Sequence, residues 1–275
     1  MFKNEKLIRL ALEEDIGSGD VTTDALIETD HVARALIIAK ESLVLAGLQV
    51  AREVFTTLDP AMGFETTFQD GDRVESGDEI LTARGKLQAL LTGERTALNF
   101  IQRLSGIATL TRKYVDRVAG SNVRLIDTRK TTPGWRRLEK YAVRVGGAYN
   151  HRLGLYDGIL IKDNHIVACG GISEAVARVR NSRPHFLRIE VEVSDLNQVK
   201  EALENGVDII MLDNMELNDI HKAVRLVDGR ALVEVSGGVT LDTLPEVANV
   251  GVDVISIGAL THSARAVDIS MRVVV

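Results

Sequence analysis

The segment from Thr128 to Arg152 concentrates positive charge in an otherwise acidic chain. It contains seven basic residues against one acidic residue, a local net charge of +6, whereas the whole 275-residue chain has a net charge of −6. Guanidinium groups bind carboxylates and phosphates through paired hydrogen bonds, and lysine adds a compact charge. With His151 inside it, the segment therefore predicts a binding site for a small polyanion. The basic residues are Arg129, Lys130, Arg136, Arg137, Lys140, Arg144 and Arg152.

Four of these basic residues, at positions 136, 137, 140 and 144, follow Pro133-Gly134 on a segment that we expect to be a helix continuing to Tyr149. We interpret these four as a solvated helix face, because charges on such a segment usually point to water. Trp135, just before them, is expected to pack against apolar neighbours.

Acidic and basic residues also stand in or at the ends of the apolar runs that follow. Lys162 closes a strongly apolar run, where an unpaired ammonium group would be costly, so it needs either a structural ion-pair partner or a ligand. Glu192 and Asp213 supply carboxylates that could hold ribose hydroxyls, a Mg²⁺ ion or a developing cation, or could pair with the basic segment. Glu190 lies two residues before Glu192 and shares its face, where it could support neighbouring basic residues.

Two glycine-containing turns have the arrangement of phosphate-binding loops. Ser236-Gly237-Gly238 lies between an apolar run and a helix expected to start near Leu241, and Ile257-Gly258-Ala259 repeats the arrangement. Backbone N–H groups at such positions hold phosphate in many α/β barrels. Each turn alone is better explained as an ordinary tight turn, whereas two in succession at the last two strands favour phosphate-binding loops.

The elements that position these residues divide the chain near residue 105. Before it, short β-like runs with turn residues at 70–71 and 76–78 indicate a small, mostly β domain with flanking helices. Helical spacing over 93–119 predicts a long bridging helix. Beyond it, six apolar runs alternate with amphipathic helices, which indicates a parallel sheet covered on both faces. The runs are residues 123–128, 158–162, 187–193, 208–213, 231–236 and 252–258.

Polar residues follow every one of these runs, and this favours a barrel over an open sheet. An open doubly wound sheet gathers ligand groups mainly at one switch point, whereas a barrel brings the carboxyl end of each strand to one rim. Six strands fall short of the eight of a complete barrel. We therefore expect an α/β protein with an incomplete α/β barrel.

Composition limits the class of protein. The chain is 45% hydrophobic and 26% charged, as expected of a soluble globular protein, and no apolar run approaches the roughly 18 residues of a membrane span. The single cysteine, Cys169, excludes an internal disulfide and suits a reducing cytoplasm. A pI near 5.6 argues against binding nucleic acid through the general charge of the protein. We expect a cytoplasmic location, and neither a nucleic acid nor a membrane as partner.

Taken together, several segments resemble the quinolinate phosphoribosyltransferase family. They are residues 94–109 (ERTALNFIQRLSGIAT), 127–166 (DTRKTTPGWRRLEKYAVRVGGAYNHRLGLYDGILIKDNHI), 190–193 (EVEV), 211–214 (MLDN), 234–239 (EVSGGV) and 255–263 (ISIGALTHS). The resemblance covers nearly the whole chain. It implies an N-terminal α/β sandwich domain over 1–105, to which a tail at about 264–275 can return, and an incomplete barrel domain over 106–263. It also implies a homodimer, or a higher homo-oligomer, in which one subunit completes the site of the other.

The activity implied by the resemblance is transfer of phosphoribosyl from phosphoribosyl pyrophosphate (PRPP) to quinolinate with decarboxylation. The products would be nicotinate mononucleotide, pyrophosphate and CO₂, in de novo NAD biosynthesis. Mg²⁺ is the implied cofactor, held with PRPP in the neighbourhood of Glu192 and Asp213, with its protein ligands unassigned.

The resemblance also implies roles for individual residues. A basic pocket for the two quinolinate carboxylates and a neighbouring phosphate would comprise Thr128, Arg129, Lys130, His151, Arg152 and Lys162. Arg95 would reach this pocket from the partner subunit. Glu192 and Asp213 would lie near the ribose, and the 5′-phosphate would be held by Ser236, Gly237, Gly238, Ile257, Gly258 and Ala259. The residues expected to carry the chemistry are Lys130, Lys162, Glu192 and Asp213.

Two functions of other classes remain open at this point. Lys162 at a strand end could form a Schiff base in a lyase or aldolase. Alternatively, the same fold could serve a non-catalytic protein that binds a phosphorylated metabolite, although the basic pocket of such a protein would be expected to be incomplete.

Overall fold

The computed structural model describes residues 4–182 and 187–274. Its contacts divide the chain into two compact units. Unit 1 comprises Met1–Arg112, Thr132–Gly147 and Ser263–Val275, and unit 2 comprises Lys113–Thr131 and Ala148–His262. This division differs from a single boundary near residue 105, because residues 106–112 continue a helix of unit 1 and residues 132–147 pack within unit 1.

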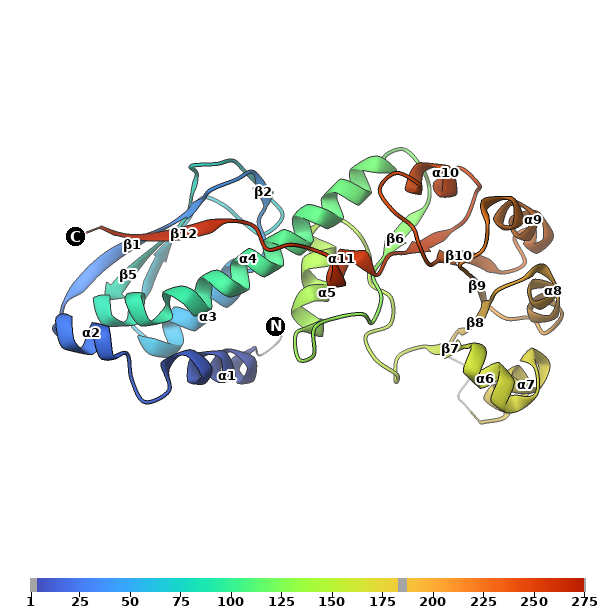
Figure 1. Ribbon diagram of the computed structural model, residues 1–275, viewed down its shortest axis with the longest axis horizontal. Helices are drawn as coiled ribbons and strands as arrows, with labels where there is room; N and C mark the ends of the chain where they lie inside the picture. The colour runs from blue at the N-terminus through green and yellow to red at the C-terminus, as the bar shows by residue number, and fades with distance from the viewer. Residues whose placement is uncertain (1–3, 183–186, 275) are drawn as a thin grey trace. The chain divides into compact units, whose positions relative to one another are not determined.

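Within the described residues, unit 1 is built on an antiparallel sheet of four strands in the order β12-β1-β5-β3, with a separate β2-β4 pair (Figure 1). The final strand runs beside the first, with Arg34 opposite Val274 and Ala39 opposite Ile269. Helix α3 packs a face made of Leu48, Val54 and other apolar residues into the core. The elements are α1 (Glu5–Ile16), α2 (Val21–Leu26), β1 (Val32–Ala39), β2 (Leu43–Val44), α3 (Leu48–Leu58), β3 (Gly63–Glu65), β4 (Arg73–Val74), β5 (Glu79–Lys86), α4 (Leu87–Arg117), α5 (Arg136–Val145) and β12 (Ile269–Val274).

Residues 132–147 belong to unit 1 because of two buried contacts with α4. The ring of Trp135 stacks on Phe100 with centroids 4.5 Å apart, which confirms the expectation that it packs. Glu139, with no exposed surface, accepts from Nη2 of Arg103 at 2.9 Å and from the backbone N–H of Thr132 at 3.1 Å. A buried carboxylate requires such partners, and they hold the segment in place.

Two expectations for this segment are wrong. Lys140 is only 3% exposed, so it does not belong to a solvated face, whereas Arg144 is exposed as expected. The helix ends at Val145 rather than at Tyr149, because Gly146 and Gly147 follow and Gly147 has φ +101°, a conformation that interrupts a helix.

In the described part of unit 2, six parallel strands form one sheet in the order β6-β11-β10-β9-β8-β7. The first strand of the unit pairs with the last, and the second strand lies at the opposite edge. The sheet is therefore a barrel with one seam unclosed, between β6 and β7, which confirms the incomplete α/β barrel. The strands are β6 (Arg124–Ile126), β7 (Ile159–Ile161), β8 (Ile189–Val193), β9 (Ile209–Asp213), β10 (Leu232–Ser236) and β11 (Val254–Ser256).

Residue Tyr149 lies on the β6 side of the seam. It forms a parallel bridge with Ile126, its N–H donates to the Leu125 carbonyl at 2.9 Å, and its ring lies 5.7 Å from the Arg124 guanidinium. These contacts hold the start of the segment that follows Tyr149 against β6.

Helices follow the strands in sequence, and Figure 1 shows α7, α8 and α9 beside strands β7 to β10. Helix α8 begins with an N-terminal cap, in which the side chain of Asp195 accepts from the N–H groups of Asn197 and Gln198. Among the described residues, none of the helices is both long enough and apolar enough to cross a membrane. The helices are α6 (Asp163–Cys169), α7 (Ile172–Ser182), α8 (Leu196–Glu204), α9 (Leu217–Val227), α10 (Leu244–Ala248) and α11 (Ala259–His262).

Candidate active site

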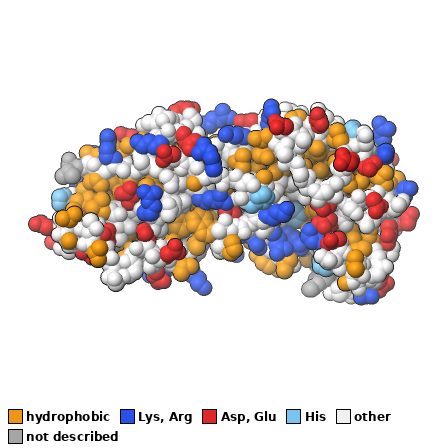
Figure 2. Space-filling model, in the orientation of Figure 1, with side chains coloured by type: hydrophobic (Ala, Val, Ile, Leu, Met, Phe, Trp, Pro, Cys, Tyr) orange, Lys and Arg blue, Asp and Glu red, His pale blue; other side chains and the backbone are white. Residues whose placement is uncertain are grey.

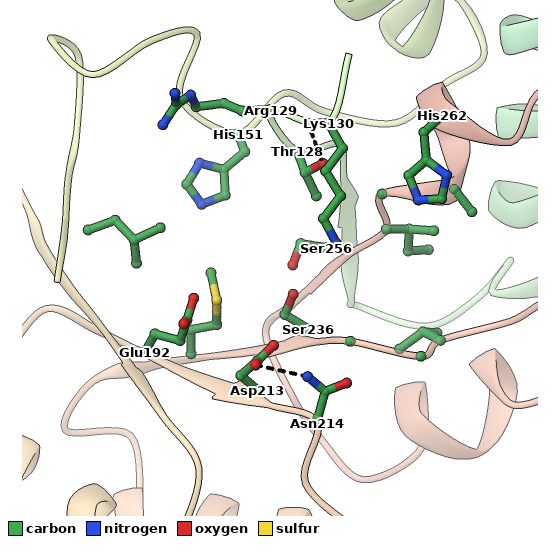
Figure 3. A pocket seen from close by; sticks show the side chains of 18 of the residues that line it. Thr128, Arg129, Lys130, His151, Glu192, Asp213, Asn214, Ser236, Ser256 and His262 are labelled. Carbon is green, nitrogen blue, oxygen red and sulfur yellow. Dashed lines mark hydrogen bonds between the residues drawn. The ribbon is translucent and has the colours of Figure 1, made fainter. Parts of the chain in front are cut away.

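The carboxyl ends of the six strands of unit 2 surround a cavity of about 680 Å³, a volume that suits a small-molecule ligand (Figure 3). In the space-filling view, Lys and Arg side chains gather around a hollow on the visible face of the part that carries these strands (Figure 2). Every site residue expected on the barrel lines this cavity. They are Thr128, Arg129, Lys130, His151, Arg152, Lys162, Glu192, Asp213, Ser236, Gly237, Gly238, Ile257, Gly258 and Ala259.

The first group of lining residues is basic and incompletely paired. The Nε atoms of Arg129 and Arg152 are buried and have no hydrogen-bond partner among the described residues. Burial lowers the pKa of Arg152, and the neighbouring charge of Arg129 lowers it further. Arg152 is anchored by one hydrogen bond, from Nη1 to the Gly158 carbonyl at 3.0 Å. Two neighbouring guanidinium groups that line the same cavity provide a binding site for an anion.

The second group is acidic and lies across the cavity from Arg129 and His151 (Figure 3). Glu192, on β8, forms an ion pair with Nζ of Lys162, so the partner expected for that lysine is a carboxylate of the same pocket. Asp213, at the end of β9, accepts a hydrogen bond from Nδ2 of Asn214 at 2.9 Å. The pocket therefore offers both signs of charge on opposite walls.

The glycine turns form two loops at the rim. Gly237 and Gly238 have φ of +89° and +64°, and a Cβ on Gly237 would lie 2.2 Å from Oδ1 of Asn214. The helix that follows begins at Leu244 rather than near Leu241, so the N–H groups of Gly237 and Gly238 belong to a loop and not to a helix end. At the second turn, a Cβ on Gly258 would lie 3.0 Å from Cδ of Lys130. Gly237 is required by its positive φ and by the close approach of Asn214, whereas Gly258 lets the side chain of Lys130 lie against the backbone.

Residue His151 is held by contacts on three atoms. Its backbone N–H donates to Oδ1 of Asp127 at 2.9 Å, and its Nδ1 accepts from the backbone N–H of Arg152 at 2.7 Å. Its Nε2 lies 3.3 Å from Oε2 of Glu190, so Glu190 supports a neighbouring basic residue, as one interpretation of the sequence proposed. Both ring nitrogens thus have protein partners.

One expected site residue lies in the other unit. Arg95 is an exposed residue of α4 in unit 1, whereas the cavity described above is lined by residues of unit 2. Its role across a subunit interface stays a prediction.

The cavity also contains residues that the sequence reasoning did not select. Asn214 and His262 stand inside segments quoted for the family resemblance, and that position was the available signal for both. Ser256 also stands inside one of these segments, but it ends an apolar run and is 3% exposed, as a core residue would be. The additional lining residues are Leu160, Met211, Asn214, Val239, Thr240, Ser256 and His262.

Comparison with known proteins identifies the family. The C-terminal domain of quinolinate phosphoribosyl transferase matches residues 107–272, and its N-terminal domain matches residues 20–105. A probable nicotinate-nucleotide pyrophosphorylase [carboxylating] of Bacillus subtilis (strain 168) is 46% identical over 269 residues, covering 98% of this chain and 93% of the relative. A quinolinate phosphoribosyltransferase [decarboxylating] 1b of Nicotiana tabacum is 41% identical, covering 97% of this chain and 81% of the relative.

Solved structures agree with this result. The crystal structure of NadC from Streptococcus pyogenes has a TM-score of 0.95 and 46% identity, covering 98% of this chain and 96% of that one. The nicotinate-nucleotide pyrophosphorylase from Ehrlichia chaffeensis has a TM-score of 0.95 and 40% identity, covering 99% of both chains. The chain belongs to the quinolinate phosphoribosyltransferase family.

Proposed function

We propose that the pocket of unit 2 transfers the phosphoribosyl group of PRPP to quinolinate and releases the 2-carboxylate of quinolinate as CO₂. The products are nicotinate mononucleotide and pyrophosphate, the reaction of de novo NAD biosynthesis. The observation that carries the proposal is one cavity whose lining combines two arginines, an acidic wall and two glycine loops. The names of the relatives, which include both directions of this reaction, support it.

Quinolinate carries two adjacent carboxylates, and the pocket has donors for both. Arg129 and Arg152, which line the cavity, would bind them through their guanidinium groups. Thr128 and Lys130, on the same loop after β6, would hold the neighbouring phosphate. Both ring nitrogens of His151 have protein partners, so we assign it a place in the pocket wall rather than a donor to the substrate.

The phosphoribosyl donor would lie over the other strands. The 5′-phosphate would be bound by the backbone of 236–238 and 257–259, where glycine lets the chain approach closely. As the bond from C1 of the ribose to pyrophosphate lengthens, C1 gains positive charge, and the carboxylates of Glu192 and Asp213 would stabilise it. Lys162, paired with Glu192, would keep that carboxylate in place.

The residues fit a Mg²⁺ ion bound with the pyrophosphate. Mg²⁺ commonly takes one or two protein carboxylates together with substrate phosphates. The Glu192 carboxylate is already engaged by Lys162, whereas Asp213 lines the cavity and accepts a hydrogen bond from the neutral amide of Asn214. We therefore propose Asp213 as the residue that holds the ion. When bound, Mg²⁺ neutralises charge on the leaving pyrophosphate.

Phosphoribosyl transfer and the loss of CO₂ would need no further cofactor. The quinolinate nitrogen forms a bond to C1 of the ribose while the bond from C1 to pyrophosphate breaks, and pyrophosphate leaves with the electron pair. The bond between ring carbon 2 and its carboxylate breaks next, and the positively charged ring nitrogen stabilises the electron pair left on that carbon. A proton takes the place of CO₂.

We also propose that the protein works as a homodimer or higher homo-oligomer in which Arg95 of one subunit completes the pocket of the other. Its exposure on α4 of unit 1 supports this role. A cytoplasmic location stays a prediction, supported by the single cysteine.

The test is incubation of the protein with quinolinate, PRPP and Mg²⁺, followed by mass detection of nicotinate mononucleotide. Borohydride treatment in the presence of substrate tests the alternative in which Lys162 forms a Schiff base. The proposal expects nucleotide product and no covalent adduct. A trapped adduct at Lys162, or tight binding of PRPP without turnover, would favour the lyase or the non-catalytic protein.

A further inference from the structure

A buried cluster lies next to the pocket and is not explained by the binding of either substrate. It consists of His151, Glu190 on β8 and Glu234 on β10, and one ring nitrogen and one oxygen of each carboxyl group lie within 4.8 Å of one another. Glu190 is 5% exposed and Glu234 is 3% exposed. His151 lines the cavity, and the two carboxyl groups do not. The cluster thus connects the wall of the pocket with the interior of the barrel.

The charges around Glu234 do not suffice for two ionised carboxyl groups. Glu190 faces it from β8, His151 from the segment after Tyr149, and the Ser256 hydroxyl from β11. On β9 its register partner is Met211, which has no charge. Arg152 acts on Glu190 and is itself repelled by Arg129. Two carboxylates this close in a buried site repel each other, which favours a proton on one of them.

Two buried carboxyl oxygens without hydrogen-bond partners in the described part of the chain indicate that the pair of glutamates holds a proton. Oε1 of Glu190 and Oε1 of Glu234 are buried and have no hydrogen-bond partner among the described residues. Ionised carboxylates only accept hydrogen bonds, whereas a protonated carboxyl also donates one. A single proton on the pair therefore supplies a donor and removes one charge. In agreement, burial first and the charge of Glu190 second raise the pKa of Glu234 to about 7.

The hydrogen bonds of His151 show which of its nitrogens bears a proton. Nδ1 accepts from the backbone N–H of Arg152 at 2.7 Å, so it carries no proton. The proton of the neutral ring is therefore on Nε2, which lies 3.3 Å from Oε2 of Glu190. A hydrogen bond from one ring nitrogen to a carboxylate fixes both the tautomer and the orientation of an imidazole.

We propose that Glu234 is the protonated member of a carboxyl–carboxylate pair with Glu190, and that the pair positions His151 as the Nε2–H tautomer in the pocket wall. Glu234 donates to Glu190, and Glu190 accepts from His151. Both glutamates act through His151 and are positioning residues. The ring accepts from the backbone N–H of Arg152, which the proposed function assigns to a quinolinate carboxylate; this link to quinolinate binding rests on the proposed function, whereas the protonation state of the pair does not.

The proposal predicts that KM for quinolinate changes with pH as Glu234 loses its proton. When Glu234 loses its proton, two carboxylates face each other and the support of His151 is disrupted. KM for quinolinate then rises above the pKa of Glu234, approaching about tenfold per pH unit as the protonated fraction falls. Because Glu234→Gln supplies a donor that does not titrate, KM in this variant should lack that rise. Glu204→Gln, at an exposed position on α8, is the matched control and should retain it.

The decisive experiment detects the protonation state of the pair directly and does not require catalytic turnover. Infrared difference spectra at pH 6 and pH 8.5 should show the carbonyl band of a protonated carboxyl in the wild type and in Glu204→Gln, lost at high pH. The band should be missing in Glu234→Gln, provided that its circular dichroism shows it to be folded. Nitrogen-15 spectra of histidine-labelled protein should show His151 as the Nε2–H tautomer at pH 6.

Several outcomes would overturn the proposal. One is a wild type without the protonated-carboxyl band at pH 6. A second is His151 as the Nδ1–H tautomer or doubly protonated at that pH. A third is a stoichiometric divalent metal in the dialysed wild type that is lost from Glu234→Gln, because the cation balancing the pair would then be a metal. If the band and the tautomer are as predicted but quinolinate is not a substrate, the proposed function fails and the pair remains.

Discussion

Replacement of Gly237 by alanine tests how the phosphate loop is held. Gly237 has φ +89°, and an alanine there would place Cβ 2.2 Å from Oδ1 and 2.5 Å from Cγ of Asn214. The side chain of Asn214 is exposed and can move away, but it would then lose its hydrogen bond to Asp213. Gly238 has φ +64°, and a Cβ at that position would meet nothing within 4 Å, so Gly238→Ala is a matched control that carries only the backbone cost.

The magnitudes separate the two effects. A positive φ costs an alanine roughly 1–2 kcal/mol at either position. Displacing Asn214 from Asp213 adds about 1 kcal/mol, the usual net value of a hydrogen bond. The additional destabilisation of Gly237→Ala over Gly238→Ala therefore corresponds to roughly 2–4 °C in the midpoint of thermal unfolding for a unit of this size.

The assay is calorimetric unfolding of four proteins that form a double-mutant cycle. They are the wild type, Gly237→Ala, Asn214→Ala and the double variant, with Gly238→Ala beside them. We expect the cost of Gly237→Ala to fall by about 1 kcal/mol in the Asn214→Ala background, because the clash and the hydrogen bond are both absent there. An equal cost in the two backgrounds would refute the contact as the reason for glycine at this position.

The remaining predictions concern single charged residues. Arg152→Lys keeps the charge but loses the planar fork, so quinolinate binding measured by calorimetry should weaken by roughly 1–3 kcal/mol, and unchanged affinity in a folded variant would argue against direct contact. Mixing inactive Arg95→Ala and Lys162→Ala subunits should restore activity in mixed dimers with one intact site, whereas verified subunit exchange without activity would place Arg95 outside the partner's pocket. The raised pKa of Glu234 means that the native state binds the extra proton, so the stability contributed by this group is present below about pH 4.5 and is lost as pH rises through about 7. The free energy of unfolding of the wild type relative to Glu234→Gln should therefore fall over that range, by an amount on the order of 3 kcal/mol, and parallel curves would contradict this.

Much of the barrel could be predicted because buried parallel strands are almost continuously apolar and end in polar residues. The pattern at 208–213 and 231–236 predicts β9 and β10 directly, and the polar residues at their ends meet at the cavity. The expected start of helix α10 is too early, although Pro245 in its first turn is an ordinary sign of a helix start. Helix α6 is missing from the sequence-based expectations because seven residues are too few to show a helical period, and its apolar residues are consecutive.

The other features of the site and fold depend on contacts between residues far apart in the sequence, which hydrophobic periodicity does not reveal. The burial of Lys140 in unit 1 cannot be read from a charge pattern that looks amphipathic and solvated. The orientation of His151 depends on Glu190 and Glu234, which come from strands separated by more than a helix in sequence and meet only when the barrel forms. Arg129 and Arg152 were expected in the pocket, but their unused Nε donors became visible only in the structure.

The central claim is that one pocket couples phosphoribosyl transfer to loss of the 2-carboxylate. The most direct measurement uses quinolinate labelled in that carboxylate and follows labelled CO₂ with and without PRPP, in the presence of Mg²⁺, while pyrophosphate is measured in parallel. We predict one CO₂ for each pyrophosphate and no CO₂ without PRPP, because the ring nitrogen must be alkylated before the carboxylate can leave. Release of labelled CO₂ in the absence of PRPP, or pyrophosphate formed without CO₂, would contradict the account.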